Sequence, residues 1–204
     1  MLRHGMTIRS LFVTRLYEAM IADPALIEDI EASCRMLAVE DRAGIAWSKG
    51  KGYRGYTSYA SLNDLPLRDP VFGDLRKSLD KHVRAFADAL HLELGRKLKL
   101  DSLWVNLLKS GGAHSGHIHP HSVISGTFYV RVPEGSGGLK FEDPRLPLMM
   151  AAPPRREDAP EDSRSFVYAE PKPGMVLLWE SWLRHEVPPG NTKGERISVS
   201  FNYS

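Results

Sequence analysis

The chain has 204 residues, of which 27 are Lys or Arg and 25 are Asp or Glu, so its formal net charge at pH 7 is +2. This length suits one large domain with its own core, and the small, dispersed charge argues against nucleic-acid binding. No apolar run reaches the roughly 18 residues that a membrane helix needs. The single cysteine, Cys34, excludes an intrachain disulfide framework and a cysteine-rich zinc site. We expect residues 1–204 to form a single cytoplasmic domain with neither membrane nor nucleic-acid partners.

The N-terminal part, residues 1–99, is expected to supply extended and helical support. Residues 7–17 are rich in β-branched and aromatic side chains and predict a short strand or an extended segment. A helix is predicted to begin at Asp23, an N-cap residue that is followed by Pro24. Residues 44–60, rich in Gly, Tyr, Ser and Lys, predict a loop with some strand character. The first helix should bury an apolar stripe with helical spacing, which consists of Leu26, Ile30, Cys34 and Leu37.

A second helix is predicted to begin at Asp69, which is again followed by a proline. Gly95 lies just past its expected end. Its apolar residues recur at spacings of three and four and are Phe72, Leu75, Leu79, Val83, Phe86 and Leu90. This stripe should pack against a sheet.

From residue 100 onward, short β-rich runs alternate with Gly, Pro and Asp. Such a pattern is typical of a sandwich, barrel or jelly roll. The expected strands are 102–109, 122–132, 138–142, 165–169, 174–180 and 195–203. Residues 143–164 are rich in Pro and charged residues and predict a long irregular insertion of the kind that often covers a binding site.

Four of the eight histidines lie within residues 114–121, whose sequence is HSGHIHPH. Residues two apart on an extended chain point to the same side, so His117 and His119 can face one metal ion. His185 follows a later strand and is the only histidine in that part of the chain. Imidazole suits iron, zinc, copper and nickel. We interpret these three histidines as a metal site; the alternative is a polar surface loop that is rich in histidine.

The last expected strand alternates sharply between two faces. The apolar face, Ile197, Val199, Phe201 and Tyr203, can pack under the helices. The other face would project Arg196 and Ser198 inward, and a buried guanidinium is costly unless an anion meets it. A carboxylate held by Arg196 with a hydroxyl as second donor would satisfy that demand. The alternative is an exposed arginine at a strand edge.

Residues 122–132 show the same alternation. Ser125, Thr127, Tyr129 and Arg131 oppose Ile124, Phe128, Val130 and Val132. If the pleat continues from the histidine run, Tyr129 faces the same cavity as His119.

Four segments carry a resemblance to a known family: HIHPHSVISGTFYV, GLKFEDPR, PGMVLLWESWLRHEVPP and RISVSFN. They resemble the 2-oxoglutarate- and Fe(II)-dependent oxygenases, and in particular a bacterial and phage subgroup with an HxHP segment followed by SGxxYV. The resemblance is strong over residues 100–204 and extends to the N-terminal part only in general layout. It implies a mainly β fold with flanking helices, built on a double-stranded β-helix (jelly-roll) core.

The resemblance implies that His117 and His185 bind Fe(II). His119 stands where the superfamily usually has Asp or Glu, so a metal face of three histidines would lack protein charge, which the dianionic cosubstrate would supply. An alternative metal face uses His119 and His121, although Pro120 makes that backbone less regular. His114 is expected outside the metal's ligand set.

The resemblance further implies that Arg196 pairs with the far carboxylate of 2-oxoglutarate and that Ser198 supports it. Tyr129 and Asn106 are further candidates for contacts with this cosubstrate. The implied activity couples the oxidative decarboxylation of 2-oxoglutarate by O2 to oxidation, as in a hydroxylase, of an unknown small-molecule or peptide substrate. Residues 143–164 and 44–60 are expected to shape the substrate pocket, and the oligomeric state stays open.

Two alternatives to this function remain. A cupin-like metalloenzyme with three histidines would need no 2-oxoglutarate, but it leaves Arg196 unexplained. A non-catalytic jelly-roll binding module belongs to another class. Release of succinate or CO2 from 2-oxoglutarate separates the first alternative from the oxygenase.

Overall fold

Two antiparallel β-sheets form the core of the computed structural model, which describes residues 7–204. The strands are β1 (Tyr17–Met20), β2 (Gly55–Thr57), β3 (Leu100–Leu108), β4 (His114–His117), β5 (Ile124–Arg131), β6 (Leu139–Glu142), β7 (Phe166–Ala169), β8 (Met175–Glu180), β9 (His185–Val187) and β10 (Arg196–Tyr203). The α-helices are α1 (Pro24–Glu40), α2 (Arg42–Gly50) and α3 (Pro70–Ala89), and short 3₁₀ turns cover Leu65–Leu67, Leu146–Leu148 and Glu161–Ser163.

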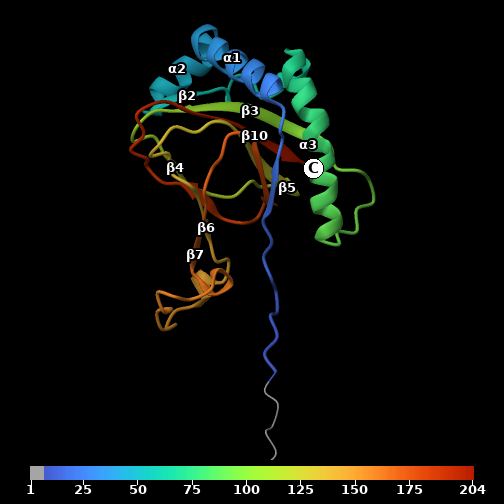
Figure 1. Ribbon diagram of the computed structural model, residues 1–204, viewed down its shortest axis with the longest axis vertical. Coiled ribbons are helices and arrows are strands. Elements are labelled where there is room, and N and C mark those ends of the chain that lie inside the picture. The colour runs from blue at the N-terminus through green and yellow to red at the C-terminus, as the bar shows by residue number, and fades with distance from the viewer. Residues whose placement is uncertain (1–6) are drawn as a thin grey trace, which may run out of the picture.

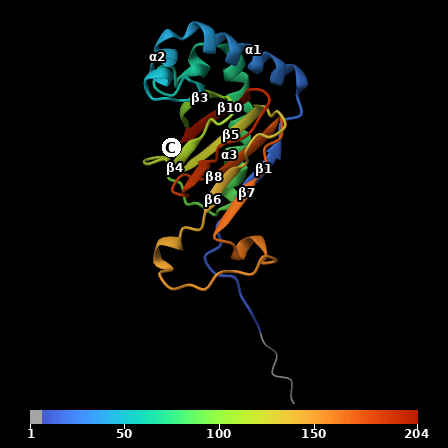
Figure 2. The same cartoon turned by 90° about the vertical axis from the view of Figure 1, so that its left-hand side faces the viewer.

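The larger sheet has the strand order β1-β8-β5-β10-β3-β2, and the smaller sheet has the order β4-β9-β6-β7. The helices cover the outer face of the larger sheet, and the smaller sheet faces its other side (Figures 1 and 2). This arrangement confirms the predicted fold, a double-stranded β-helix with flanking helices. No helix in residues 7–204 combines the length and apolarity needed to cross a membrane.

Both long helices begin where the sequence predicts. The side chain of Asp23 accepts a hydrogen bond from Leu26 N at 3.1 Å, and that of Asp69 accepts one from Val71 N at 3.0 Å. Each proline occupies the first helical position, where its missing N–H costs nothing. Cys34 is fully buried on α1 and belongs to the core, as its position on the apolar stripe predicts.

In the N-terminal part, the strand alternative for residues 7–17 was wrong over most of its length, and the expected loop over residues 44–60 was also wrong. Residues 7–16 form no strand, because pairing with β8 begins only at Tyr17, opposite Leu178, and the residues before it are mostly exposed. Residues 44–60 are not mainly a loop, because α2 covers their first part and β2 lies near their end. The carboxylate of Asp41 caps α2 by accepting a hydrogen bond from Gly44 N at 3.0 Å.

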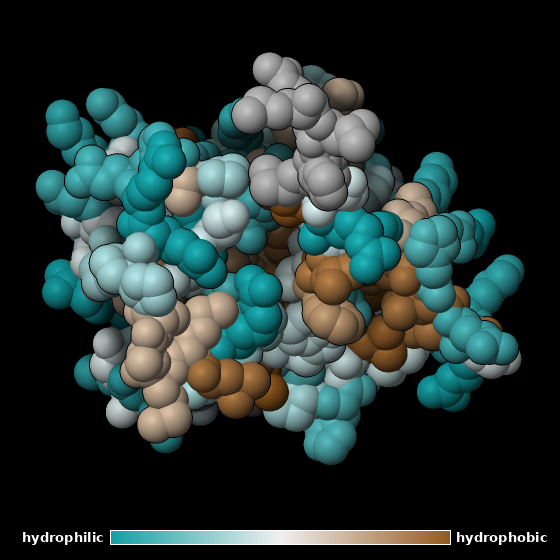
Figure 3. Space-filling view, turned by 90° about the horizontal axis from the view of Figure 1, so that it is seen from below, coloured by the Kyte–Doolittle hydropathy of each residue, from teal (hydrophilic) through white to brown (hydrophobic). Residues whose placement is uncertain are grey.

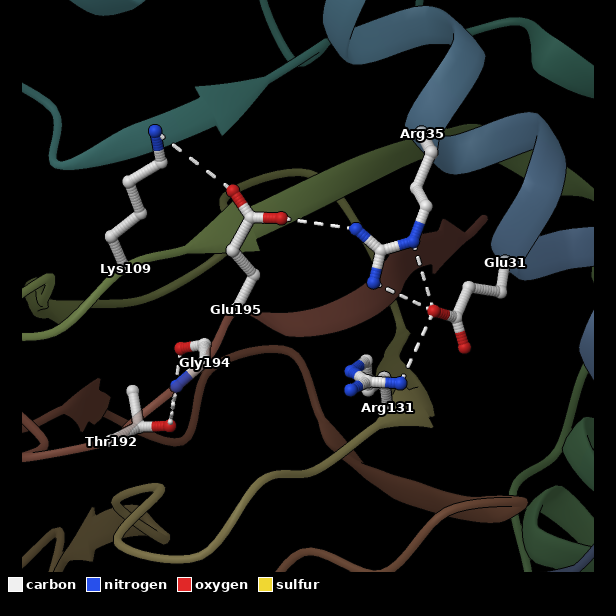
Figure 4. Close-up of polar contacts among 7 residues, drawn as sticks. All are labelled: Glu31, Arg35, Lys109, Arg131, Thr192, Gly194 and Glu195. Atoms are coloured by element: carbon white, nitrogen blue, oxygen red, sulfur yellow. Dashed lines mark hydrogen bonds and ion pairs between the residues drawn. The ribbon is translucent and has the colours of Figure 1, made fainter.

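The alternation of the last strand is observed. Ile197, Val199 and Phe201 are fully buried in the core beneath the helices. The alternation predicted for β5 breaks near its end, where the pairing with β10 shifts between Ile197 and Ser198. After this bulge Arg131 points outward and contacts Glu31 on α1 at 3.5 Å (Figure 4).

The insertion between β6 and β7 is irregular apart from its two 3₁₀ turns, as predicted. It projects from one end of the molecule, on the same side as the N-terminal arm (Figures 1 and 2). Seen from this end, apolar side chains lie at the surface in patches between hydrophilic ones (Figure 3). The large apolar residues most exposed in the arm and the insertion are Ile8, Phe12, Leu148 and Met150.

Candidate active site

A cavity of about 570 Å³ lies between the two sheets. β3 and β10 contribute one wall, β4 and β9 contribute another, and residues from 47 to 59 complete the lining. Tyr59 and Ile118 are exposed side chains that mark its rim. No residue of the insertion 143–164 lines this cavity. The expectation that the insertion covers the site was therefore wrong, whereas the segment 44–60 does border it.

The strand pairing brings His117, His119 and His185 together. β4 and β9 are antiparallel neighbours in which His117 lies opposite His185, and their ring centroids are 4.4 Å apart. His119 follows β4, and its backbone N–H donates to the carbonyl of Ser181 at 2.9 Å. One ring nitrogen of each histidine lies within 4.8 Å of those of the other two. The three candidate ligands thus converge on one point of the cavity wall.

Each of the three rings is oriented by an oxygen at its Nδ1 atom. The oxygen belongs to the carbonyl of Ser115 for His117 (2.7 Å), to the carbonyl of Leu183 for His185 (2.8 Å) and to the side-chain amide of Asn202 for His119 (2.6 Å). Because these oxygens can only accept, Nδ1 carries the proton and Nε2 keeps its lone pair. Such contacts are the usual orientation device of metal-binding histidines.

The free lone pairs face one another. Nε2 of His119 lies 3.3 Å from Nε2 of His185. Burial lowers the pKa of His119 to about 4 and that of His185 to about 3, so both rings are neutral near pH 7. Two lone pairs at this distance repel unless a cation lies between them. The donor set therefore fits a divalent first-row metal ion.

Asn202 is a site residue that the sequence reasoning missed. Its side-chain oxygen accepts from both His119 and Ser125, and its NH2 group donates to Ser102 at 3.1 Å. These contacts determine which way the amide points. The signal was present in the alternation of β10, because Asn202 shares the inward face with Arg196.

His121 and His114 have different surroundings from the three converging histidines. His121 lies in a turn with φ of 70° and does not line the cavity, so it does not join His119 at the converging ring nitrogens. His114 lines the cavity on β4, opposite Val187. Its Nε2 atom lies 2.7 Å from the hydroxyl of Tyr53.

Arg196 is buried without a counter-ion. Its side chain is 5% exposed, one NH2 group donates to the carbonyl of Gly137 at 3.0 Å, and Nε has no partner. No carboxylate in residues 7–204 pairs with it, and none of the described residues that line the cavity is Asp or Glu. Burying an uncompensated guanidinium is strongly unfavourable, so this end of the cavity favours an anionic ligand.

The other candidate cosubstrate residues differ in how accessible they are. Ser198 lines the cavity. Asn106 also lines it, but its amide already accepts from Thr57 at 2.8 Å and donates to Ser200 at 3.0 Å. Tyr129 is fully buried beneath Arg196, 5.2 Å from the ring centroid to the guanidinium carbon, and does not line the cavity.

A network of ion pairs holds the chain next to Arg196 from outside the cavity (Figure 4). The carboxylate of Glu195 lies 3.1 Å from Arg35 on α1 and 3.9 Å from Lys109, which follows β3. Arg35 also contacts Glu31 at 2.7 Å. Single surface pairs contribute at most about 1 kcal/mol each, but together these contacts tie the start of β10 to α1.

Aromatic rings line the path from the rim to the histidines. Tyr59 is half exposed and meets Trp104 edge to face with centroids 5.2 Å apart. Trp104 in turn stacks on His119 at 6.0 Å. On the opposite side Trp179 lies 4.6 Å from the ring of His185. These ring contacts contribute to the burial of His119 and His185.

Comparison with known proteins agrees with this geometry. Residues 102–202 match the model of a family described as "Putative 2OG-Fe(II) oxygenase". This segment contains the three histidines and Arg196. No curated protein matches the sequence.

Several solved structures share the fold. A prolyl-4-hydroxylase from Pseudomonas putida is 16% identical over 93% of this chain and 92% of its own, with a TM-score of 0.62. The viral collagen prolyl hydroxylase of Paramecium Bursaria Chlorella virus-1, solved with 2OG, is 13% identical over 92% and 94%, with a TM-score of 0.56. HygX from Streptomyces hygroscopicus, solved with nickel and 2-oxoglutarate, is 16% identical over 94% and 83%, with a TM-score of 0.62. These solved structures show the shared fold, and the family match assigns residues 102–202, the part of the chain that contains the three histidines and Arg196, to the 2OG-Fe(II) oxygenases.

Proposed function

We propose that His117, His119 and His185 hold Fe(II) in this enzyme and that Arg196 binds the far carboxylate of 2-oxoglutarate. The observation that carries the proposal is that three oriented imidazoles and one buried guanidinium without a counter-ion share one cavity. Bound iron would supply the activation of O2 that couples decarboxylation of 2-oxoglutarate to substrate oxidation. The reaction is that of a dioxygenase of the hydroxylase type.

The charges of the site support a dianionic cosubstrate. Three imidazole ligands carry no negative charge and so leave a dication uncompensated by protein charge, and the described residues of the cavity lining include no carboxylate. A cosubstrate with two carboxylates would compensate the metal at one end and Arg196 at the other. Ser198 lies two residues from Arg196 on the same face of β10 and would add a hydroxyl donor there.

We assign the substrate to the rim, where Tyr59 and Ile118 are exposed and Trp104 lies buried against Tyr59. Within residues 7–204, no acidic side chain lines the cavity to pair with a cationic group, and an anionic group would compete with the cosubstrate for Arg196. The group that reaches the iron is therefore uncharged and largely apolar, whether it belongs to a small molecule or to a peptide. Tyr59 and Trp104 provide aromatic faces for it.

The test combines metal loading with turnover. We expect the protein to bind a stoichiometric amount of Fe(II) anaerobically and then to release succinate and CO2 from 2-oxoglutarate when O2 is admitted. Arg196→Met should weaken 2-oxoglutarate binding at least about a hundredfold, because a bidentate charge-assisted contact is lost, while Fe(II) binding stays nearly unchanged. Metal binding without any consumption of 2-oxoglutarate would favour the cupin-like alternative instead.

A further inference from the structure

A hydrogen-bonded pair, Tyr53 and His114, lines the cavity together with Arg196. The tyrosine hydroxyl and Nε2 of the histidine are 2.7 Å apart, and the two rings are inclined by 32°. Tyr53 comes from the turn before β2, whereas His114 begins β4 in the other sheet. The pair therefore joins the two sheets, although neither residue belongs to the converging histidines.

The register places this pair near the guanidinium. Leu108 on β3 is the partner of Arg196 on one side and of Gly55 on the other. Tyr53 precedes Gly55 by two residues and packs in the same apolar cluster as Leu108. The charge on Arg196 also acts on both members of the pair, since it opposes the rise that burial causes in the pKa of Tyr53 and adds to the fall in the pKa of His114.

The protonation states of Tyr53 and His114 determine where the hydroxyl proton of Tyr53 can be donated. Burial above all lowers the pKa of His114 to about 3, and burial raises the pKa of Tyr53, so near pH 7 both groups are neutral. If Nε2–H of His114 donates to the tyrosine oxygen, the O–H of Tyr53 is free to donate to a third group. An anion at Arg196 is such an acceptor, and its presence favours this arrangement.

Ser198 is the other hydroxyl donor in the cavity lining at this end. The hydroxyl of Tyr129 has no partner, but Tyr129 does not line the cavity, and both ends of the Asn106 amide are already engaged. We infer that Tyr53, positioned by His114, donates a hydrogen bond to the carboxylate that Arg196 binds, and that this pair selects a carboxylate over an uncharged group of the same shape. The inference rests on the proposed function, because it assigns further residues to the same cosubstrate.

The test compares two keto acids on the Fe(II)-loaded protein without O2, where binding is measured by calorimetry and no turnover occurs. One probe is 2-oxoglutarate, and the other is 5-methyl-2-oxohexanoate, in which two methyl groups replace the oxygens of the far carboxylate. Tyr53→Phe should weaken 2-oxoglutarate roughly tenfold and change 5-methyl-2-oxohexanoate by less than about twofold, because a hydrogen bond to a charged group is lost in the first case alone. Tyr168→Phe, at an exposed position on β7 that does not line the cavity, is the matched control and should change neither constant.

Because we infer that His114 acts through Tyr53, its variants are judged by the ratio of the affinities for the two keto acids. His114→Phe should lower the preference for 2-oxoglutarate over 5-methyl-2-oxohexanoate, and the double variant with Tyr53→Phe should be no worse than Tyr53→Phe alone. His114→Gln, whose NH2 group can still donate to the tyrosine oxygen, should restore most of the preference. A merely structural role would weaken both keto acids equally.

The outcomes separate this inference from the proposed function. If Tyr53→Phe keeps full affinity for 2-oxoglutarate, or loses affinity for both acids in parallel, the inference is overturned while the proposed function stands. If Arg196→Met binds 2-oxoglutarate as tightly as the wild type, the proposed function itself fails. Thermal unfolding of each variant verifies that the fold is retained, and His114→Phe provides the test if Tyr53→Phe does not fold.

Discussion

The side chain of Asn202 shows how one residue outside the three candidate ligands can set the geometry of the proposed metal site. It holds Nδ1 of His119 at 2.6 Å and is itself held by Ser125 and Ser102. Because the amide cannot rotate without losing these contacts, His119 presents Nε2 to the cavity. A partner of this kind contributes to metal affinity without touching the metal.

Asn202→Ala should therefore weaken Fe(II) binding by roughly ten- to a hundredfold, because His119 loses the acceptor that orients its ring. Competition with a chelator under anaerobic conditions measures the affinity. Ser200→Ala, on the same face of β10 but without contact to His119, is the control and should leave it unchanged. An Asn202→Ala variant with wild-type affinity and intact fold would contradict this role.

Single substitutions can test whether His117 or His121 binds the metal together with His119. His119→Ala removes one of the three converging nitrogens, so we expect the metal affinity to fall by at least about a hundredfold. His121→Ala removes a side chain that does not line the cavity, so its affinity should stay within about twofold of the wild type. Equal losses of metal affinity in the two variants would mean that His119 and His121 bind the metal together. Chelator competition gives both constants.

At the scale of the elements, α2 depends on contacts between distant residues. Besides capping α2 through Gly44 N, the carboxylate of Asp41 accepts hydrogen bonds from Tyr56 at 2.9 Å and from Ser61. Burial acts to raise the pKa of Asp41, but these hydrogen bonds together lower it below its usual range. This one carboxylate thus joins α2 to the segment that carries Tyr53 and Tyr59 at the cavity.

Asp41→Asn should lower the free energy of unfolding by about 1 kcal/mol at pH 7, because the cap keeps an acceptor but loses its charge. Since the folded-state pKa is lowered, the charge stabilises the fold above the unfolded pKa of about 3.9, and that contribution is lost as the pH falls through the folded value. The difference between wild type and variant should therefore shrink on acidification below about pH 4. Urea unfolding at several pH values measures it, with the exposed Asp29→Asn as a control that shows no such trend.

At the scale of the whole molecule, the insertion between β6 and β7 is separate from the cavity. Glu142 pairs with Phe166, and the N–H of Asp143 donates to the carbonyl of Ser165 at 2.9 Å, so the two strands already meet where the insertion leaves them. No residue of 143–164 lines the cavity. The binding of the cosubstrate should then be independent of this segment.

Replacing residues 145–163 by a short Gly-Asn-Gly turn should keep the hairpin and leave the dissociation constant for 2-oxoglutarate within about twofold of the wild type. Calorimetry on the Fe(II)-loaded protein without O2 measures this constant. A large loss of affinity in a shortened chain that unfolds at the same temperature would show that the insertion reaches the site after all. Succinate release in air provides a second measure.

The elements that the sequence predicted correctly depend on local signals, whereas those that it missed depend on residues farther along the chain. The starts of α1 and α3 were predicted because an Asp–Pro pair and a stripe with spacings of three and four are local signals. The capped start of α2 was missed because much of what holds its N-cap comes from Tyr56 and Ser61, farther along the chain. Residues 7–16 carry the composition of a strand, yet they find no neighbouring strand to pair with.

Some features of the site follow from the order of residues alone: the alternation of β10 placed Arg196 and Ser198 on the inward face, and the spacing of His117 and His119 put them on one side of the chain. The partners that these residues contact depend on how distant segments pack. The pairing of β4 with β9 brought His185 opposite His117, and the approach of the two sheets placed Tyr53 against His114. Local periodicity follows from the geometry of a few consecutive residues, whereas such encounters depend on the burial and pairing of segments far apart in the chain.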